Sequence, residues 1–297
     1  MVKKAFIAGF IIFLGYSLYI SNYKTYSASQ NQNQDNLVKA QQYMYNDFVP
    51  ENVIVGTSLS CHIHTESLKN FYNLAFNGSS IYDGLNVILN GNTLPQNVFI
   101  ESNLYLNDKS DLLYSQLFDA YPFYASKFLP MLRVVNQPIG KLIYCMNPLG
   151  DRIVEKHNLF MKRLKQKLNQ SVDKNINTNK KTNVFKKMIA IESKKYSEFP
   201  SKFLVSKKIK VLDSIIDILY KKGVNVIFYE MPINHDLMKS KRTIQLRNDL
   251  KRMFRFKVKY FSLDMRKYIT SDGVHLNPEE SIRYTDFFKK QILKQKI

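Results

Sequence analysis

The stretch that most constrains the fold is residues 53–60, VIVGTSLS. Three consecutive β-branched residues, Val53 to Val55, predict a buried strand, and Gly56 opens a sharp turn after it. We expect a helical segment over residues 65–71 to follow. Open α/β sheets bind their ligands at the carboxyl ends of strands, so this pattern places Ser58 there, close to the N-terminal dipole of that helix. The same pattern also describes an ordinary helix N-cap, so Ser58 becomes a candidate nucleophile only together with a second motif.

The second motif lies near the C-terminus, in residues 270–280, TSDGVHLNPEE. Asp272 precedes His275 by three residues, and Gly273 between them lets the carboxylate fold back onto the imidazole Nδ1. The other ring nitrogen is then free to take a proton from a hydroxyl, which is the logic of a Ser-His-Asp triad. An Asx turn leading to a helix N-cap at Asn277, with Pro278 at the first helical position, explains the same residues structurally. The two interpretations are compatible, because such a turn would present the Asp and the His.

Four segments together resemble the motif blocks of the SGNH/GDSL hydrolase family. Residues 56–59 (GTSL) resemble the first block with Thr57 in place of the usual aspartate, and residues 73–80 (NLAFNGSS) resemble the second. Residues 98–103 (VFIESN) resemble the third, and residues 272–276 (DGVHL) match the fifth. The third block departs most, because Glu-Ser-Asn-Leu stands where the family has Gly-x-Asn-Asp. The resemblance covers residues 50–105 and 205–295.

The resemblance implies a three-layer α/β/α sandwich around a parallel sheet, of the flavodoxin-like SGNH type, with no metal or organic cofactor. It implies that Ser58 is the nucleophile, His275 the general base and Asp272 the residue that orients the imidazole. The oxyanion hole would consist of the Ser58 and Gly78 amides and the Asn103 side chain. Asn107 is the alternative to Asn103.

The implied activity is that of a serine esterase or an O-acyltransferase working through an acyl-enzyme. Membrane-anchored, extracytoplasmic proteins of this kind often act beside membrane-bound O-acyltransferases, which implies such a partner and acyl esters of cell-surface or cell-wall carbohydrate as substrates. Two alternatives stay open: a catalytically inactive module that binds a glycan or a membrane acyltransferase, and a lipid esterase.

The N-terminus predicts a membrane anchor. Residues 5–20 (AFIAGFIIFLGYSLYI) form an uncharged apolar run after Lys3 and Lys4. Extended to Tyr23, the run is near the lower limit of ~17–25 residues for a membrane span. We expect an uncleaved signal anchor with its N-terminus in the cytoplasm by the positive-inside rule, and the rest of the chain outside. A cleavable signal peptide is the alternative.

The pattern of the remaining chain predicts three parts: an anchor over residues 1–23, a linker and short helix over 24–50, and an SGNH-like domain over 51–297. We expect a largely helical insertion at about 104–200 in that domain. Within it, residues 112–135 predict an aromatic helix interrupted by Pro122 and Pro130, which suits a cap over the site, a membrane-surface segment or a core layer. Residues 169–183 are polar and predict a surface loop.

Charge is concentrated in the second half of the chain. Residues 151–297 hold 35 of the 44 Lys and Arg but 15 of the 24 Asp and Glu. On an extracytoplasmic domain this favours anionic polymers or lipid headgroups as partners, the alternative being a solvated lysine-rich face. The export signal argues against nucleic acid as a partner.

The remaining cysteines and histidines carry weaker signals. Cys61 and Cys145 do not define a disulfide framework. His62 and His64 are interpreted as local polar residues and not as a metal site. His235, at the end of another predicted strand, is the internal rival of His275, but it has no aspartate at matching spacing.

Overall fold

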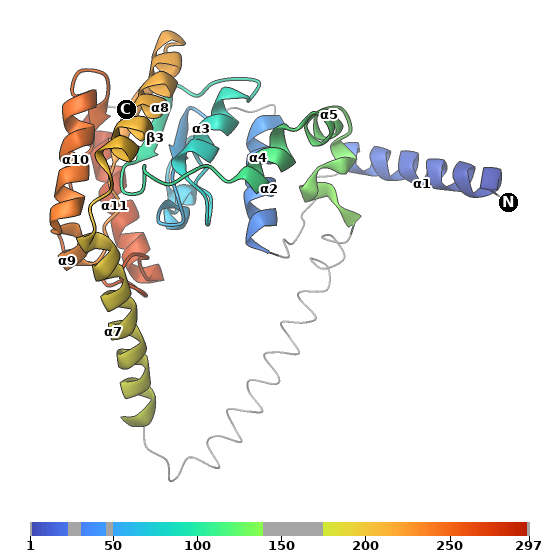
Figure 1. Cartoon of the computed structure of the whole chain (residues 1–297). Coiled ribbons are helices and arrows are strands. Elements are labelled where there is room, and N and C mark those ends of the chain that lie inside the picture. The colour runs from blue at the N-terminus through green and yellow to red at the C-terminus, as the bar shows by residue number, and fades with distance from the viewer. Residues whose placement is uncertain (1, 23–30, 46–49, 139–174, 296–297) are drawn as a thin grey trace. The chain divides into compact units, whose positions relative to one another are not determined.

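A five-stranded parallel sheet lies at the centre of the fold (Figure 1). The computed structural model describes residues 2–22, 31–45, 50–138 and 175–295. The strand order is β2-β1-β3-β4-β5, and every neighbouring pair is parallel. The strands are β1 (Asn52–Val55), β2 (Phe71–Asn73), β3 (Asn97–Glu101), β4 (Asn225–Tyr229) and β5 (Lys259–Tyr260). The predicted α/β class with a parallel sheet is therefore confirmed.

This strand order places a crevice beside β1 and β3. The chain leaves β1 toward β2 on one side, and β3 lies on the other side of β1. In doubly wound sheets such a reversal of strand order opens a crevice at the carboxyl ends of the two strands, where ligands bind. The residues that follow β1 and β3 are therefore the first place to look for a site.

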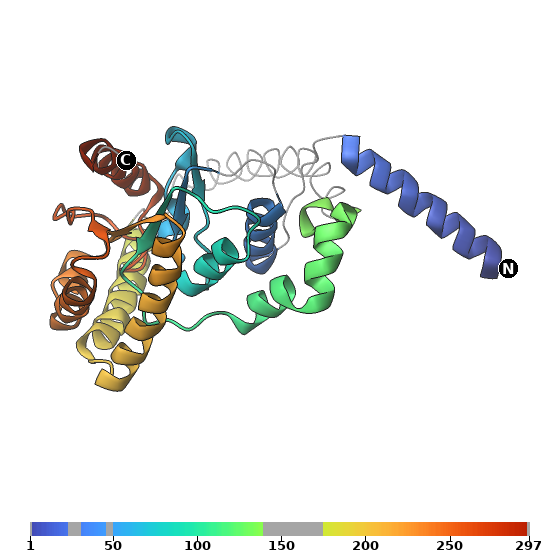
Figure 2. The ribbon, with the colours of Figure 1, turned by 90° about the horizontal axis from the view of Figure 1, so that it is seen from above.

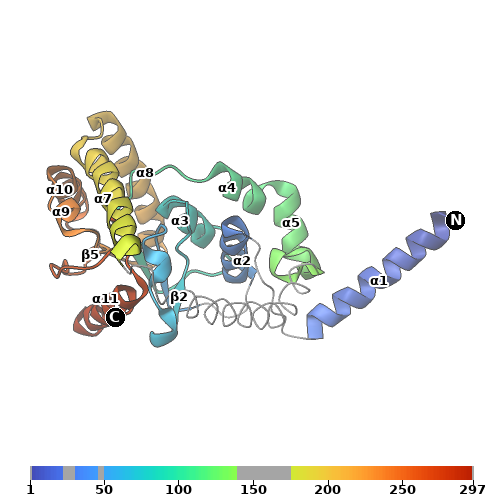
Figure 3. The same cartoon turned by 90° about the horizontal axis from the view of Figure 1, so that it is seen from below.

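Helices cover both faces of the sheet, which completes the three layers (Figures 2 and 3). On one face α11 (Pro278–Gln295) inserts Phe288, whose ring centroid lies 5.5 Å from that of Phe99 and 5.2 Å from that of Tyr229. On the other face lie α3 (Ile81–Leu89) and α8 (Lys202–Lys221), the second with a buried stripe of Leu212, Ile216 and Leu219. Two further helices, α9 (His235–Met238) and α10 (Lys241–Phe254), follow β4.

The predicted helix over residues 65–71 is wrong. Two 3₁₀ turns, η1 (Ser60–His62) and η2 (Thr65–Ser67), connect β1 to β2, and Phe71 already pairs with Asn52 in the sheet. The last residue of the predicted helix, Phe71, therefore belongs to strand β2 instead. As a result Ser58 does not lie at the N-terminus of a regular α-helix.

The predicted loop over residues 169–183 is also wrong where it can be compared. Helix α7 (Asn175–Ser197) includes residues 175–183, while 169–174 lie outside the described residues. The C-terminal part of α7 packs on the fold, with Ile189 against Gly273. A helix anchored in this way extends into polar sequence at small cost, because propagation is easier than nucleation.

The aromatic segment after β3 is helical and is interrupted before Pro130, as predicted, but the predicted break at Pro122 is wrong. It consists of α4 (Asp111–Phe118), α5 (Ala120–Phe128) and the 3₁₀ turns η3 (Pro130–Leu132) and η4 (Val134–Asn136). Pro122 lies in the first turn of α5, where its missing N–H has no helical partner to lose. The chain breaks at Asp119 instead. Residues 104–200 are therefore largely helical over their described part.

The chain divides into two compact units, residues 1–42 with 112–176 and residues 43–111 with 177–297. The first contains most of α2 (Gln32–Tyr45) and α1 (Val2–Asn22), an apolar helix long enough to cross a membrane. Helix α1 contacts η3, and the Tyr16 hydroxyl donates to the carbonyl of Asn136. The second unit contains the sheet and every residue of the site described next.

Candidate active site

The turn after β1 presents Ser58 at the carboxyl edge of the sheet. Ser60 N–H donates to the Thr57 carbonyl (3.1 Å), and Leu59 N–H donates to the Thr57 hydroxyl (3.3 Å), so Thr57 closes a tight turn around the serine. Thr57 and Ser60 are buried, whereas Ser58 between them is half-buried. The turn therefore directs the Ser58 hydroxyl away from the core.

Glu101, the last residue of β3, ties this turn to the sheet from below. Its side chain has no exposed surface, and it accepts hydrogen bonds from Thr57 N–H (2.9 Å), the Thr57 hydroxyl (2.9 and 3.1 Å) and the Ser60 hydroxyl (2.6 Å). The Tyr229 hydroxyl donates in turn to Ser60 Oγ (2.6 Å), so strand β4 joins the same network. Burial raises the pKa of Glu101, while its donors and nearby His275 oppose that rise. A buried carboxyl with this many donors is a firm anchor for the turn.

Gly56 is required because Glu101 comes so close. A Cβ at position 56 would lie 2.5 Å from Ser60 Cβ and 2.8 Å from Glu101 Oε2. Both distances are shorter than van der Waals contact. Glycine is therefore the residue that lets the carboxylate reach the backbone of the turn.

Two departures from the resembled motifs are in direct contact with each other. Thr57 stands where the first block has aspartate, and Glu101 stands where the third block has glycine. In the structure the acidic side chain is on the strand beside the turn, and the Thr57 hydroxyl donates to it (2.9 Å). The contact between Thr57 and Glu101 was not predicted from the sequence, because only the pairing of β1 with β3 brings the two residues together.

The histidine loop is held by short-range bonds. Residues Thr270 and Leu276 form an antiparallel bridge around it, and Ser271 N–H donates to the His275 carbonyl (2.8 Å). Gly273 adopts φ +107° and packs under Ile189 of α7, which excludes a side chain there. Beyond the loop, Asn277 caps α11 by accepting from Glu280 N–H (2.8 Å), with Pro278 as the first helical residue, as predicted.

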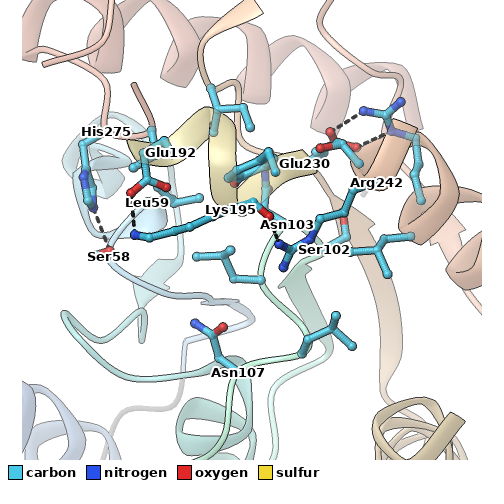
Figure 4. Close-up of a pocket in the computed structure, with 18 of the residues that line it drawn as sticks. Ser58, Leu59, Ser102, Asn103, Asn107, Glu192, Lys195, Glu230, Arg242 and His275 are labelled. Atoms are coloured by element: carbon cyan, nitrogen blue, oxygen red, sulfur yellow. Dashed lines mark hydrogen bonds and ion pairs between the residues drawn. The ribbon is translucent and has the colours of Figure 1, made fainter. Parts of the chain in front are cut away.

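The loop brings Asp272, His275 and Ser58 into one hydrogen-bonded chain. Asp272 Oδ2 lies 2.6 Å from His275 Nδ1. His275 Nε2 lies 2.8 Å from Ser58 Oγ, a contact drawn in Figure 4. The other oxygen, Oδ1, accepts the backbone N–H groups of Val274 (3.0 Å) and His275 (2.8 Å). Burial raises the pKa of Asp272, but these donors outweigh it and hold that pKa below its ordinary value. An ionised Asp272 therefore faces the imidazole, which orients Nε2 toward the serine.

The predicted oxyanion-hole residues differ in whether their polar groups are free to act beside Ser58. Gly78, at φ +67°, and Asn107 line a cavity of about 510 Å³ together with Ser58. The Asn103 side chain is engaged elsewhere: its amide donates to the Met231 carbonyl (2.8 Å) and accepts from Met231 N–H (2.7 Å). Asn107 makes no such bond to Met231, and it lines both this cavity and the neighbouring one drawn in Figure 4. The geometry thus favours Asn107 over Asn103 as an amide donor beside the serine.

A larger cavity of about 530 Å³ opens on the other side of Ser58 and His275. Charged residues line it from α7, β4 and α10. Glu192 pairs with Lys195 (2.6 Å), and Glu230 forms a bidentate pair with Arg247 (2.6 and 2.7 Å). A third glutamate, Glu198, is exposed.

Arg242 is the cation of this cavity for which the described residues offer no carboxylate within ion-pair distance. Its guanidinium donates to the Lys195 carbonyl, lies 5.6 Å from the Tyr196 ring centroid and reaches into the cavity (Figure 4). This one hydrogen bond leaves most of its five N–H donors for a ligand. No motif marks Arg242 in the sequence, so its position in this cavity was not predicted.

The other candidate residues lie apart from this chain. His235 begins α9, where Asn234 caps the helix by accepting from Asp236 N–H (3.0 Å). The Cys61 thiol lies 3.3 Å from the Ala75 carbonyl, and Cys145 lies outside the described residues. Among the residues that the structure describes, no group of three His, Cys, Asp or Glu side chains is arranged to hold a metal ion.

Comparisons with known proteins add little to this geometry. No family model and no curated protein match the chain. A search of solved structures finds a "putative platelet activating factor" from Streptococcus pneumonia, at 10% sequence identity and a TM-score of 0.43. The match covers 89% of this chain and 92% of that chain. At this identity and TM-score the likeness assigns no family, so function has to be argued from the site itself.

Proposed function

We propose that the chain is a serine esterase or O-acyltransferase of the SGNH type, working through an acyl-enzyme on Ser58. The observation that carries the proposal is the chain of contacts from Asp272 through His275 to Ser58, at 2.6 and 2.8 Å. A serine bonded to an imidazole that is itself oriented by a carboxylate is the arrangement that activates a hydroxyl.

In the proposed reaction the Ser58 oxygen attacks the carbonyl carbon of an ester while its proton passes to His275 Nε2. Asp272 stabilises the imidazolium that forms. Collapse of the tetrahedral intermediate breaks the bond to the alcohol, which leaves with the proton from His275. Water or a sugar hydroxyl then gives its proton to His275 and takes the acyl group, and His275 returns that proton to the departing Ser58 oxygen. Water makes the chain an esterase, and a sugar hydroxyl makes it an O-acyltransferase.

The oxyanion of the intermediate would be stabilised by the Ser58 and Gly78 amides and an asparagine side chain. We infer that Asn107 is that asparagine, because the amide of Asn103 is engaged by Met231. Removing one oxyanion donor typically costs ~2.7–4 kcal/mol of transition-state stabilisation. Asn107→Ala should therefore lower kcat about 10²–10³-fold. A larger kcat loss in Asn103→Ala, in protein of wild-type stability, would reverse the assignment.

The test of the proposal is labelling of the full chain, in detergent micelles, with a fluorophosphonate probe. Wild type should label, and Ser58→Ala and His275→Ala should not. His235→Ala is the matched control, because His235 begins α9 and lines neither cavity beside Ser58, and it should label as wild type does. Folded wild type that does not label would favour the alternative of a non-catalytic module that binds a glycan or a membrane partner.

The acceptor or ester substrate is proposed to be anionic. Arg242 reaches into the cavity beside Ser58, and the second half of the chain carries the whole net charge of +20. The test substrates are acetylated uronic-acid oligomers, which are acidic, and acetylated hexose oligomers, which are neutral. An anion-selective site should prefer the acidic ester, whereas a general carbohydrate site should not. The ratio of kcat/KM for the acidic over the neutral ester should fall about tenfold in Arg242→Gln, since a charge-assisted hydrogen bond contributes about 1.5–3 kcal/mol.

Lys241→Gln provides the matched control for that experiment. Lys241 is exposed at the start of α10 and does not line the cavity, so the ratio should stay at its wild-type value. An unchanged ratio in Arg242→Gln would contradict an anionic substrate. That result would not contradict the proposed serine chemistry, because fluorophosphonate labelling tests it separately.

Cellular placement is proposed from α1 and its flanking charges. Lys3 and Lys4 lie in the first turn of α1, ahead of its apolar run, and α1 is long enough to span a bilayer, so the N-terminus would stay in the cytoplasm and the sheet unit would lie outside. A membrane-bound O-acyltransferase as the acyl donor follows from the family resemblance alone. A reporter enzyme fused to the C-terminus, active only outside the cytoplasm, tests the topology.

A further inference from the structure

The exposed face of α5 carries three large aromatic side chains. Tyr121, Tyr124 and Phe128 are 81%, 56% and 67% exposed, and their spacing places them on one side of the helix. Leu129 and Leu132, each 40% exposed, continue the apolar surface into η3. We call these five residues the α5 aromatic surface.

The opposite side of α5 is the side that packs. Ser126 is buried, its hydroxyl accepts from the Gln41 amide of α2 (3.2 Å), and its carbonyl accepts from Arg133 Nε (2.9 Å). A short helix in water normally buries its aromatic side chains and exposes its serine. Here the arrangement is the reverse, so the aromatic surface requires an apolar occupant.

The first unit contains a feature that identifies this occupant. Helix α1 packs against η3 through its last turns, where the Tyr16 hydroxyl donates to the Asn136 carbonyl. Tyr16 precedes the end of α1 at Asn22 by six residues, or about 9 Å at 1.5 Å per residue. If α1 spans a bilayer, η3 and the adjoining α5 therefore lie at the depth of the interface between headgroups and acyl chains. Interfacial helices bury their apolar face by ~5–10 Å in the same zone.

The side chains of the surface suit that zone chemically. Tyrosine combines an apolar ring with a hydroxyl that stays hydrated, which is why it is enriched at membrane interfaces. Lys127 lies 6.0 Å from the Phe128 ring centroid, and its flexible stem lets the ammonium group reach lipid phosphates. We propose that the α5 aromatic surface inserts into the membrane interface and forms a second lipid contact beside α1. This inference is independent of the proposed chemistry at Ser58.

The chain has no tryptophan, so one substitution creates a unique fluorescent reporter. The full chain carrying Phe128→Trp is reconstituted into phosphatidylcholine vesicles with some phosphatidylglycerol, with or without lipids brominated in the upper acyl chain. The proposal predicts a loss of about half of the emission or more with brominated lipid, because the indole would lie within the ~5–10 Å interfacial zone. Acrylamide in the water should quench it weakly. Tyr124→Trp repeats the measurement at a second position.

Phe256→Trp is the reference for an exposed aromatic outside this surface, since Phe256 is 90% exposed in the other unit. The proposal requires stronger quenching by brominated lipid at position 128 than at 256. Quenching of Phe128→Trp by acrylamide alone would overturn it, because the surface would then face water. Protection from both quenchers would overturn it as well, since protein would then cover the surface.

Discussion

The two sides of the Ser58–His275 contact are stabilised in different ways. On the serine side, a fully buried carboxyl on β3 and a tyrosine on β4 hold the turn after β1, so three strands contribute. On the histidine side, Asp272 and His275 are each 32% exposed in their side chains, and they bond mainly within their own loop.

This difference separates folding from catalysis. The serine turn cannot be loosened without leaving buried polar groups unpaired, which costs stability. The histidine loop can lose the orienting function of its carboxylate while its backbone keeps most of its bonds. We therefore expect substitutions on the serine side to lower the free energy of unfolding and substitutions on the histidine side to lower kcat.

The largest expected effect is that of Asp272→Asn on kcat. The asparagine oxygen can still accept the Val274 and His275 N–H groups, but the amide nitrogen cannot accept the imidazole Nδ1–H, so the wrong tautomer faces Ser58. We expect kcat to fall about 10⁴-fold, as in other triads, with the free energy of unfolding unchanged within ~1 kcal/mol. Ester hydrolysis and urea denaturation measure the two quantities. Asp236→Asn, at an exposed aspartate next to His235, should change neither.

Glu101→Gln tests the serine side. The side-chain NH₂ of glutamine would face Thr57 N–H or the Ser60 hydroxyl in place of an acceptor, so the free energy of unfolding should fall by about 2–3 kcal/mol. Urea denaturation measures it, with Glu66→Gln, an exposed glutamate, as the control. A Glu101→Gln variant as stable as wild type would contradict the expected difference between the serine side and the histidine side.

Gly56→Ala should cost about 1–3 kcal/mol of stability, because the new methyl group meets Ser60 and Glu101 below contact distance. The two substitutions share one contact, so the loss in the double variant with Glu101→Gln should differ from the sum of the single losses. Additive losses would mean that Gly56 is required for another reason.

The smallest expected effect is the pH dependence of stability, and it has opposite signs on the two sides. The folded state raises the pKa of Glu101 above its ordinary 4.5, so the folded protein binds this proton more tightly, and stability falls as the pH rises through that range. The folded state lowers the pKa of Asp272 below 3.8, so its contribution is present above 3.8 and is lost as the pH falls through the folded pKa. Each slope is at most about 1.4 kcal/mol per pH unit.

Urea denaturation between about pH 3 and pH 7 measures both slopes as differences from wild type, which isolates one carboxyl at a time. The difference in free energy of unfolding between wild type and Glu101→Gln should shrink as the pH rises from 4.5. The difference between wild type and Asp272→Asn should grow as the pH rises to 3.8 and stay constant above it. Slopes of the same sign would show that one of the two environments is misassigned.

The histidine side could be predicted from the sequence because its geometry is local. The spacing of Asp272 and His275, the glycine between them and the cap at Asn277 are all within reach of one turn. The buried strand β1 was predictable for a similar reason, since a run of β-branched residues needs no partner to be recognised.

The serine side could be predicted only in part. Ser58 follows from its motif, but the function of Glu101 depends on the register that pairs Ile100 with Val55, which no short-range pattern specifies. Asn103 was preferred over Asn107 by motif position, and the backbone of Met231, more than a hundred residues away, is what engages it. Arg242 was missed for the same reason, because its position in the cavity depends on how α10 packs beside α7.

The order of the residues along the chain determines when each part of the site is synthesised. His275 follows Ser58 by 217 residues, and all five strands precede it. Because synthesis proceeds from the N-terminus, an emerging chain exposes its nucleophile long before the base that activates it. The base also depends on α11, whose Phe288 joins the sheet core after it. A chain that is still being made, or one that has lost its last helix to a protease or a premature stop codon, would therefore carry Ser58 but no working catalyst.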